Sequence, residues 1–537
     1  MQGLEGMRRM RIDQARLSAG LAASIAAVAF GGMLAMASPA AAEDCAELAA
    51  AALPQGQVTS ATLVPAGAFT PPPSPFGPPP GVAATSFKTL PAFCRVQATL
   101  TPTPDSDIKV EVWMPAAGWN GKLVGIGNGV WAGSISYAQL GEPVSRGYAA
   151  AATDAGHVGN GFSAEFAVGH PEKLLDFGYR GVHAMTLAAK AALRAYYGDG
   201  PRRSYWNSCS TGGRQGLMEA YRYPDDYDAI SAMAPANPMT DLMTQSLWTG
   251  FQAVRAPGAG LAPAKLAALH KAYLARCDGK DGLVDGLVSA PIGCRFDPAV
   301  IQCQGAEGAE CLTAAQVQTM RAIYGGVRDP KTGAQVLPGF PPGSEMQLPV
   351  LISGAEPFPV ATSYMRLLVF GEAPGWNFRS FDYGADTLKA RAFGAAILDV
   401  HPDGLGPFFA RGGKLLLSHG WTDGLIPANN TVAFYQRLAP RLSARQARNQ
   451  LRLFMVPGMN HCSGGEGPSS IDTLSALDQW TSTGAAPDRL IASRPPAPGR
   501  PPLSRPLCPF PLVSRYKGRG PTDQADSFAC AAPAGRG

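Results

Sequence analysis

The chain has 537 residues and a mass of 55.9 kDa, enough for roughly three or four average domains or for one large α/β domain with an insertion. Charged residues make up 16 %, whereas 49 Pro and 63 Gly account for about a fifth of the chain, which indicates many loops and tight turns. The 46 % hydrophobic content excludes wholesale disorder. The net charge of +5, with no basic cluster beyond the N-terminus, argues against nucleic-acid binding.

The N-terminus has the pattern of an export signal. Four arginines precede an uncharged stretch from Leu17 to Ala42, which ends in an A-x-A cleavage pattern. We therefore expect residues 1–42 to be a signal peptide and the mature protein to be secreted or periplasmic, without a membrane segment. The alternative is an uncleaved anchor, which the Ala- and Gly-rich composition and Pro39 disfavour. Ten cysteines, an even number, fit an oxidising compartment.

A proline-dense segment occupies about 64–91. After it, the sequence predicts strands that alternate with helices. Strand patterns occupy 94–100, 108–114, 122–126, 148–153, 414–418 and 451–456, with a helical pattern at 179–197 and a strand, sharp turn and helix at 204–221. This alternation predicts an α/β domain with a mostly parallel sheet. Residues 238–407 show little strand alternation, several helical stretches and four cysteines, so we expect an inserted lid between two parts of the core, 43–237 and 408–537.

Ser210 lies between a buried strand and a helix and is flanked by small residues. Such a setting is typical of the nucleophile elbow of α/β-hydrolases, whose strained turn excludes bulky neighbours. The segment departs from G-x-S-x-G at its first position, where Ser208 replaces Gly. A serine that only caps a helix is the alternative to a nucleophile here.

Two later residues complete a triad in the order that α/β-hydrolases use, which is Ser, acid, His. Asp423 lies just past the strand at 414–418, and His461 lies just past the strand at 451–456. We expect His461 to take the Ser210 proton, Asp423 to orient His461, and Ser210 to attack an ester carbonyl. The fold class expected is thus an α/β-hydrolase core with a large inserted lid.

Two cysteines adjoin the proposed triad. Cys209 precedes Ser210 and Cys462 follows His461, so the two thiols meet if the triad forms. In an exported protein we expect them to form a disulfide. A thiol nucleophile at Cys209 is an alternative, but it would be redundant beside Ser210.

An oxyanion hole needs backbone N–H groups aimed at the developing charge. Thr211, directly after the nucleophile, is expected to supply one. A glycine-rich loop after the strand at 122–126 is expected to supply the other, from Gly129 in preference to Gly127 or Asn128. The glycine spacing does not match a dinucleotide-binding fingerprint.

Together these segments resemble the tannase and feruloyl esterase family, which includes mono(2-hydroxyethyl) terephthalate hydrolases. The resemblance rests on a Cys-Ser pair, an Asp and a His-Cys pair, and on matching segments along nearly the whole mature chain. These are Ala152–His157, Tyr179–His183, Tyr205–Gly216, Arg222–Asp228, Pro342–Glu345, Gly420–Asp423 and Asn460–Cys462. Departures are Ser208 for the usual Gly, Ala155 for a frequent Thr, and a shortened segment after Glu345.

The resemblance implies a disulfide-rich protein with five bridges, which spacing alone does not determine. The implied pairs are Cys45–Cys94, Cys209–Cys462, Cys277–Cys294, Cys303–Cys311 and Cys508–Cys530.

It also implies a structural calcium ion in the lid, between Cys277 and Cys294. The ligands carried over are the side chains of Asp278, Asp281 and Asp285 and the carbonyls of Leu283 and Leu287. Carboxylates and carbonyls with glycines for sharp turns suit this cation, although the spacing is not that of an EF-hand. By itself, the pattern fits a solvated acidic turn equally well.

The expected function is hydrolysis of carboxylic esters of aromatic or hydroxyaromatic acids through an acyl-enzyme, on a small-molecule substrate and without an organic cofactor. Galloyl esters, feruloyl esters and a terephthalate monoester are the substrates that the resemblance implies. A broad short-chain esterase and a catalytically silent binding protein on the same fold are the alternatives. The sequence leaves the oligomeric state open.

Overall fold

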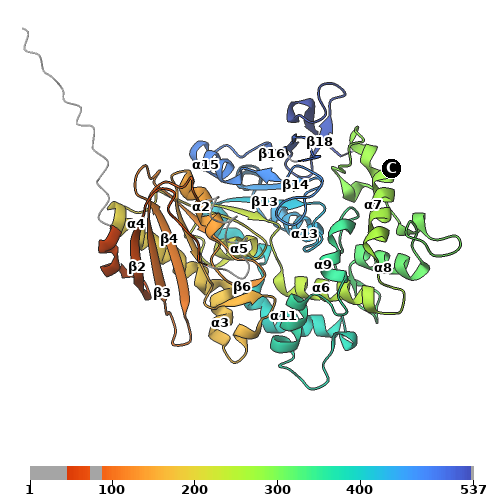
Figure 1. Ribbon diagram of the computed structural model, residues 1–537, viewed down its shortest axis with the longest axis horizontal. Helices are drawn as coiled ribbons and strands as arrows, with labels where there is room; N and C mark the ends of the chain where they lie inside the picture. The colour runs from red at the N-terminus through yellow and green to blue at the C-terminus, as the bar shows by residue number, and fades with distance from the viewer. Residues whose placement is uncertain (1–44, 73–86, 497, 534–537) are drawn as a thin grey trace, which may run out of the picture. The chain divides into compact units, whose positions relative to one another are not determined.

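A ten-stranded mixed sheet organises the part of the chain that the computed structural model describes, which comprises residues 45–72, 87–496 and 498–533 (Figure 1). The expected signal peptide, 1–42, lies outside these residues. In spatial order the strands are β1 (Ala52–Leu53), β2 (Gly56–Val64), β3 (Phe93–Leu100), β4 (Ile108–Pro115), β7 (Ala149–Thr153), β5 (Lys122–Ile126), β9 (Arg203–Cys209), β10 (Ala229–Met233), β13 (Lys414–Gly420) and β14 (Leu451–Val456).

The sheet has an antiparallel half and a parallel half. Neighbouring strands pair antiparallel from β1 through β4 to β7 and parallel from β7 through β5 to β14. All six strand patterns expected from the sequence are confirmed. The expectation of a mostly parallel sheet overlooks the antiparallel half, in which a short turn joins β3 to β4 and so permits only antiparallel pairing.

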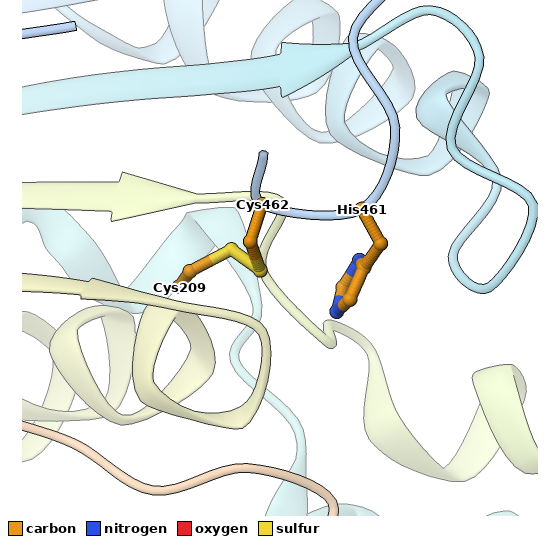
Figure 2. A group of neighbouring side chains, drawn as sticks. All are labelled: Cys209, His461 and Cys462. Carbon is orange, nitrogen blue, oxygen red and sulfur yellow. A yellow bond between two sulfur atoms is a disulfide. The ribbon is translucent and has the colours of Figure 1, made fainter. Parts of the chain in front are cut away.

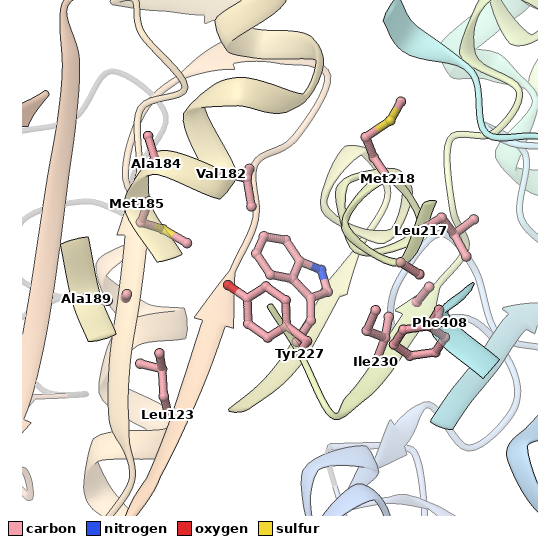
Figure 3. Close-up of a cluster of buried hydrophobic side chains, with 14 of the residues drawn as sticks. Leu123, Val182, Ala184, Met185, Ala189, Leu217, Met218, Tyr227, Ile230 and Phe408 are labelled. Carbon is pink, nitrogen blue, oxygen red and sulfur yellow. The ribbon is translucent and has the colours of Figure 1, made fainter. Parts of the chain in front are cut away.

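Helices cover both faces of the sheet. Successive residues of each strand point to opposite sides, and apolar side chains on both sides are buried against helices. In β5, Leu123 packs in the cluster that includes helix α4 (Gly181–Tyr197) and helix α5 (Thr211–Arg222), whereas Val124 packs with helix α2 (Tyr137–Ser145) and helix α15 (Thr473–Thr483). Figure 3 shows the first cluster, in which Val182 of α4 and Leu217 of α5 lie around Tyr227 and Ile230.

The chain between β10 and β13 is largely helical and makes up the side of Figure 1 that holds α6 to α9. Its helices are α6 (Met239–Val254), α7 (Pro263–Cys277), α8 (Ala314–Gly325), α9 (Pro349–Ile352), α10 (Pro359–Ser363), a π-helical turn (Tyr364–Val369), α11 (Ala385–Leu398) and α12 (Gly406–Ala410). One small hairpin, β11 (Val327–Arg328) with β12 (Gln335–Leu337), interrupts them. The 238–407 boundaries of a separate lid domain stay a prediction.

Besides short 3-10 turns, the described chain has further strands and helices. They are β6 (Trp131–Gly133), β8 (Gly159–Gly161), α3 (Pro171–Leu175), a π-helical turn (Asp176–Arg180), α13 (Ala428–Leu438), α14 (Ala444–Gln450), β15 (Ser470–Ile471), β16 (Leu490–Arg494), β17 (Leu503–Leu507), β18 (Val513–Tyr516) and β19 (Phe528–Ala531). None of the helices in this described part is both long and apolar enough to cross a bilayer.

Five disulfides cross-link these elements, and they join the pairs that the resemblance implies. Cys45–Cys94 ties the N-terminal segment to β3, and Cys508–Cys530 closes the C-terminal segment onto β19. Cys277–Cys294 and Cys303–Cys311 lie between β10 and β13. The fifth bond joins residues 209 and 462, which are 253 positions apart.

Candidate active site

Ser210 occupies a strained turn between β9 and α5. Its φ of 63° and ψ of −127° are unfavourable for any residue with a β-carbon. Two backbone hydrogen bonds hold the turn, since Ser210 N donates to Met233 O and Ala236 N donates to Ser210 O, each at 3.0 Å. The strand, sharp turn and helix expected from the sequence are thus present.

Ser208 fits the elbow although it replaces a glycine. Its hydroxyl accepts a hydrogen bond from Gly127 N at 3.2 Å, and its side chain is buried. A β-carbon on Gly212 would lie 2.1 Å from Ser208 Oγ. A glycine is therefore required at position 212, on the helix side of the turn. The space at position 208, on the strand side, is large enough for a serine side chain.

Asp423 and His461 meet where β13 and β14 end. The Nδ1–H of His461 donates to Asp423 Oδ2 at 2.7 Å, while the other carboxylate oxygen accepts from Leu425 N at 2.8 Å and Ile426 N at 2.9 Å. The carboxylate has no solvent exposure. These contacts fix the tautomer of His461, which leaves Nε2 without a proton whenever the ring is neutral.

A second histidine contacts the same carboxylate. His419, fully buried at the end of β13, donates from Nε2 to Asp423 Oδ2 at 3.0 Å, and its Nδ1 lies 2.7 Å from Thr431 Oγ1. This histidine was not among the predicted site residues. Its signal was its place at the end of the strand, four residues before the acid.

The charges of the pair stabilise each other. Burial alone would raise the pKa of Asp423, but the charge of His461 and hydrogen bonds from both histidines hold the pKa of this carboxyl well below its usual range. Burial opposes a charge on His461 as well, yet the neighbouring Asp423 carboxylate raises the pKa of His461 above its ordinary value of 6.5. Asp423 is therefore ionised across the whole physiological range.

The Cys209–Cys462 disulfide links the two chain segments that carry Ser210 and His461. The Cα atoms of the two cysteines are 6.0 Å apart. One ring nitrogen of His461 lies within 4.8 Å of both sulfurs. Figure 2 shows the His461 ring beside the disulfide. Each cysteine is bonded directly to one member of the Ser210 and His461 pair, so this bond sets the separation of their backbones.

The glycine-rich loop after β5 lies against the start of α5. Asn128 N donates to Gln215 Oε1 at 2.9 Å, Gly212 N donates to Asn128 O at 2.8 Å, and Thr211 Oγ1 donates to Val130 O at 2.9 Å. Among the described residues, the amides of Gly129 and Thr211 have no hydrogen-bond partner. These are the two amides that the sequence analysis selected for an oxyanion hole, whereas those of Gly127 and Asn128 are occupied.

Comparison with known proteins identifies the family. The model described as "Tannase and feruloyl esterase" matches residues 94–531. The chain belongs to the tannase and feruloyl esterase family. It is a carboxylic ester hydrolase with an α/β architecture of that type, as the resemblance implies.

Relatives and a solved structure agree with this assignment. An uncharacterised esterase of Xanthomonas campestris pv. campestris is 36 % identical and is aligned over 94 % of this chain and 93 % of its own. The mono(2-hydroxyethyl) terephthalate hydrolase of Piscinibacter sakaiensis is 32 % identical over 84 % and 87 % of the two chains. The crystal structure of feruloyl esterase B from Aspergillus oryzae superposes with a TM-score of 0.81 at 27 % identity, covering 91 % of this chain and 100 % of that one.

In this esterase, the largely helical chain between β10 and β13 is called the helical insertion, and its aromatic side chains meet the core beside the glycine-rich loop. Tyr364 stacks on Trp131 with ring centroids 5.8 Å apart, and Trp131 Nε1 donates to Val360 O at 3.1 Å. Further aromatic residues between β10 and β13 pack in the same cluster as Tyr364; the set is Trp248, Phe251, Phe358, Tyr364, Trp376 and Phe378. Tyr364 and Phe378 are buried in it and the other four are half-buried, so the cluster is at least in part the insertion's own core.

The esterase's acidic loop between Cys277 and Cys294 has the oxygen donors that calcium prefers. Asp278 is buried, and its Oδ1 has no hydrogen-bond partner in the described structure. Burial and neighbouring carboxylates raise the pKa of Asp281 to about 6, and burial raises the pKa of Asp285. Arg505 Nη2 donates to Asp285 Oδ2 at 2.5 Å, so it partly neutralises the loop. The unpartnered oxygen of Asp278 fits a cation, while the carboxylate oxygens of Asp278, Asp281 and Asp285 do not all lie within 4.8 Å of one another in the described structure.

Proposed function

We propose that this carboxylic ester hydrolase is a serine esterase that acts through an acyl-enzyme. Ser210 Oγ attacks the ester carbonyl while His461 Nε2 takes its proton. The tetrahedral intermediate expels the alcohol, which receives that proton, and the acyl group stays on Ser210. Water activated by His461 then releases the carboxylic acid and restores Ser210.

The observation that carries the proposal is the Asp423–His461 hydrogen bond of 2.7 Å beside the Cys209–Cys462 disulfide. The ionised Asp423 stabilises the imidazolium that forms when His461 accepts the proton. The backbone strain at Ser210 supports a nucleophilic role, because such strain is common at functional sites.

The developing negative charge on the carbonyl oxygen needs hydrogen-bond donors. We assign this role to the backbone N–H groups of Gly129 and Thr211, which are free for a ligand in the described structure. Preorganised donors of this kind are worth about 10²–10³ in kcat when one is removed.

The substrates proposed are esters of aromatic or hydroxyaromatic acids, such as galloyl and feruloyl esters or a terephthalate monoester. The relatives support this class, since they include a feruloyl esterase and a mono(2-hydroxyethyl) terephthalate hydrolase. Aromatic side chains near Trp131 provide an apolar environment suited to a flat acyl group.

A labelling experiment tests the chemistry. A fluorophosphonate should label the folded protein, and Ser210→Ala should abolish both labelling and hydrolysis of p-nitrophenyl acetate. Hydrolysis by folded Ser210→Ala would rule out the serine mechanism. Comparison of methyl gallate, methyl ferulate, mono(2-hydroxyethyl) terephthalate and p-nitrophenyl acetate tests the acyl preference. Similar kcat/KM for all four would instead indicate a broad short-chain esterase.

We further propose a structural calcium ion held by the side chains of Asp278, Asp281 and Asp285 and the carbonyls of Leu283 and Leu287. Bound there, the ion would offset the repulsion among the carboxylates and rigidify the loop. It has no part in the ester chemistry.

Export is the last element of the proposal. The basic and apolar N-terminus supports removal of residues 1–42, and five disulfides fit a secreted or periplasmic protein. N-terminal sequencing of the mature protein is expected to begin at Glu43, and an intact N-terminus would contradict cleavage.

A further inference from the structure

Gln215 on α5 forms a reciprocal amide pair with Asn128 in the glycine-rich loop. Gln215 Oε1 accepts from the backbone N–H of Asn128 at 2.9 Å, and Gln215 Nε2 donates to Asn128 Oδ1 at 2.8 Å. Gln215 is 1 % exposed and Asn128 is 7 % exposed. Hydrogen bonds between two buried amides are costly to break, because each group is then left without water or a partner.

The orientation of the Asn128 side-chain amide is fixed by two hydrogen bonds on the side away from α5. Asn128 Nδ2 donates to Thr153 O at 2.8 Å and to Ser134 O at 3.0 Å. Its Oδ1 must therefore face α5, where Gln215 supplies the matching donor. Neither amide can flip without losing hydrogen bonds, so Asn128 links α5 to the carboxyl end of β7 in one arrangement.

The glycine-rich loop also lies so close to α5 that no residue larger than glycine fits at position 127. A β-carbon on Gly127 would be 2.4 Å from Gly212 Cα and 2.6 Å from Gln215 Oε1. The amide of Gly127 is already bonded to Ser208, and that of Asn128 to Gln215. The next amide in the loop, that of Gly129, has no hydrogen-bond partner among the described residues.

We propose that Gln215 is a positioning residue that aims the Gly129 N–H at the oxyanion by holding Asn128 against α5. This inference rests on the proposed function. Because a preorganised donor acts on the charge that develops in the transition state, its displacement is expected to lower kcat more than it raises KM.

Gln215→Met tests the role, since methionine has a similar length but makes neither hydrogen bond. With p-nitrophenyl acetate, kcat is expected to fall about 10- to 100-fold while KM changes less than about threefold. The affinity for an arylboronic acid, which forms a tetrahedral adduct on Ser210, is expected to fall in parallel with kcat.

Gln450→Met is the matched control. Gln450 is also buried and donates to Phe409 O at 2.8 Å and Gly413 O at 3.1 Å, but it lies at the amino end of β14, far along the strand from the catalytic loops. The Gln450→Met substitution is expected to lower the melting temperature and leave kcat unchanged. Equal kcat and boronate affinity in the two variants would overturn the positioning role.

Gln215→Glu keeps the test decisive if the methionine variant does not fold. A protonated glutamic acid can make both hydrogen bonds, whereas its carboxylate repels Asn128 Oδ1. Its kcat relative to the unsubstituted enzyme is expected to fall as pH rises to about 9, where even a buried carboxyl ionises. Unchanged relative kcat over that range would overturn the proposal.

Ser210→Ala in the same assays separates the two ideas. Activity that survives Ser210→Ala refutes the serine mechanism itself. An inactive Ser210→Ala beside a fully active Gln215→Met refutes only the role of Gln215.

Discussion

His461 Nδ1 and Asp423 Oδ2 are 2.7 Å apart, and the Asp423 carboxylate is completely shielded from water. A buried charge on Asp423 is tolerated because two histidines and two backbone amides surround it. The acid is thus held in place before any substrate binds.

Replacement of this acid is expected to disable the enzyme without unfolding it. In Asp423→Asn the amide loses the charge that stabilises the imidazolium and favours the wrong tautomer of His461, so kcat should fall about 10⁴-fold. Steady-state kinetics and circular dichroism check this. A loss below about tenfold in folded protein would show that Asp423 does not orient the base.

Activity is expected to decline as pH is lowered through the raised pKa of His461. The base works only when its Nε2 is unprotonated, and the Asp423 carboxylate favours the protonated ring, so the midpoint of kcat/KM should lie above pH 6.5. A pH profile of kcat/KM measures this midpoint. A midpoint well below 6.5 would contradict the coupling of the two side chains.

Removal of the Cys209–Cys462 bond is expected to lower both stability and activity. In the chain-entropy model, a bond across 253 residues stabilises the fold by on the order of 5 kcal/mol. Cys209→Ala with Cys462→Ala should therefore melt at a lower temperature and have a lower kcat, because the backbones of Ser210 and His461 then move independently.

The bond between Cys303 and Cys311 provides the control. It spans 8 residues and is worth about 2–3 kcal/mol in the same chain-entropy model, and it lies between β10 and β13, in a segment without any of the three proposed triad residues. Cys303→Ala with Cys311→Ala should melt lower but keep its kcat. Unchanged kinetics in the 209 and 462 double variant would argue against a catalytic role for that disulfide.

Removal of calcium is expected to lower the melting temperature rather than to stop catalysis directly. EGTA should destabilise the enzyme, because three carboxylates then repel one another in one loop, and added calcium should restore it. Asp278→Asn should lose this response, whereas Asp297→Asn, at an exposed pair with Arg321, should keep it. Thermal melts that EGTA does not shift would refute the ion site.

Ser208→Gly is expected to keep most activity. The substitution removes one hydrogen bond to Gly127 N, worth about 0.5–1.5 kcal/mol, and adds backbone entropy to the unfolded chain. The melting temperature should fall by a few degrees, while kcat stays within about threefold because Gln215 still holds the loop. A loss of kcat as large as that of Gln215→Met would contradict this expectation and show that Ser208 also positions the glycine-rich loop.

Much of the site could be predicted because its signals are local in sequence. The small residues around Ser210, the residues directly after two buried strands, and the cysteines beside them each indicate a position at the same sheet edge. The contact of His419 with Asp423 and the pairing of Gln215 with Asn128 could not be predicted, because each depends on side-chain directions between segments. The antiparallel pairing of strands β1 to β4 could not be predicted, because alternation of side chains indicates a strand but does not specify its pairing direction.

The covalent link between residues 209 and 462 has a consequence for chain integrity. Every peptide bond of the helical insertion lies between these two cysteines, so a single protease cut there leaves both halves of the catalytic machinery on one disulfide-linked molecule. In this way the bond keeps Ser210 and His461 on one molecule after a nick that would otherwise separate them.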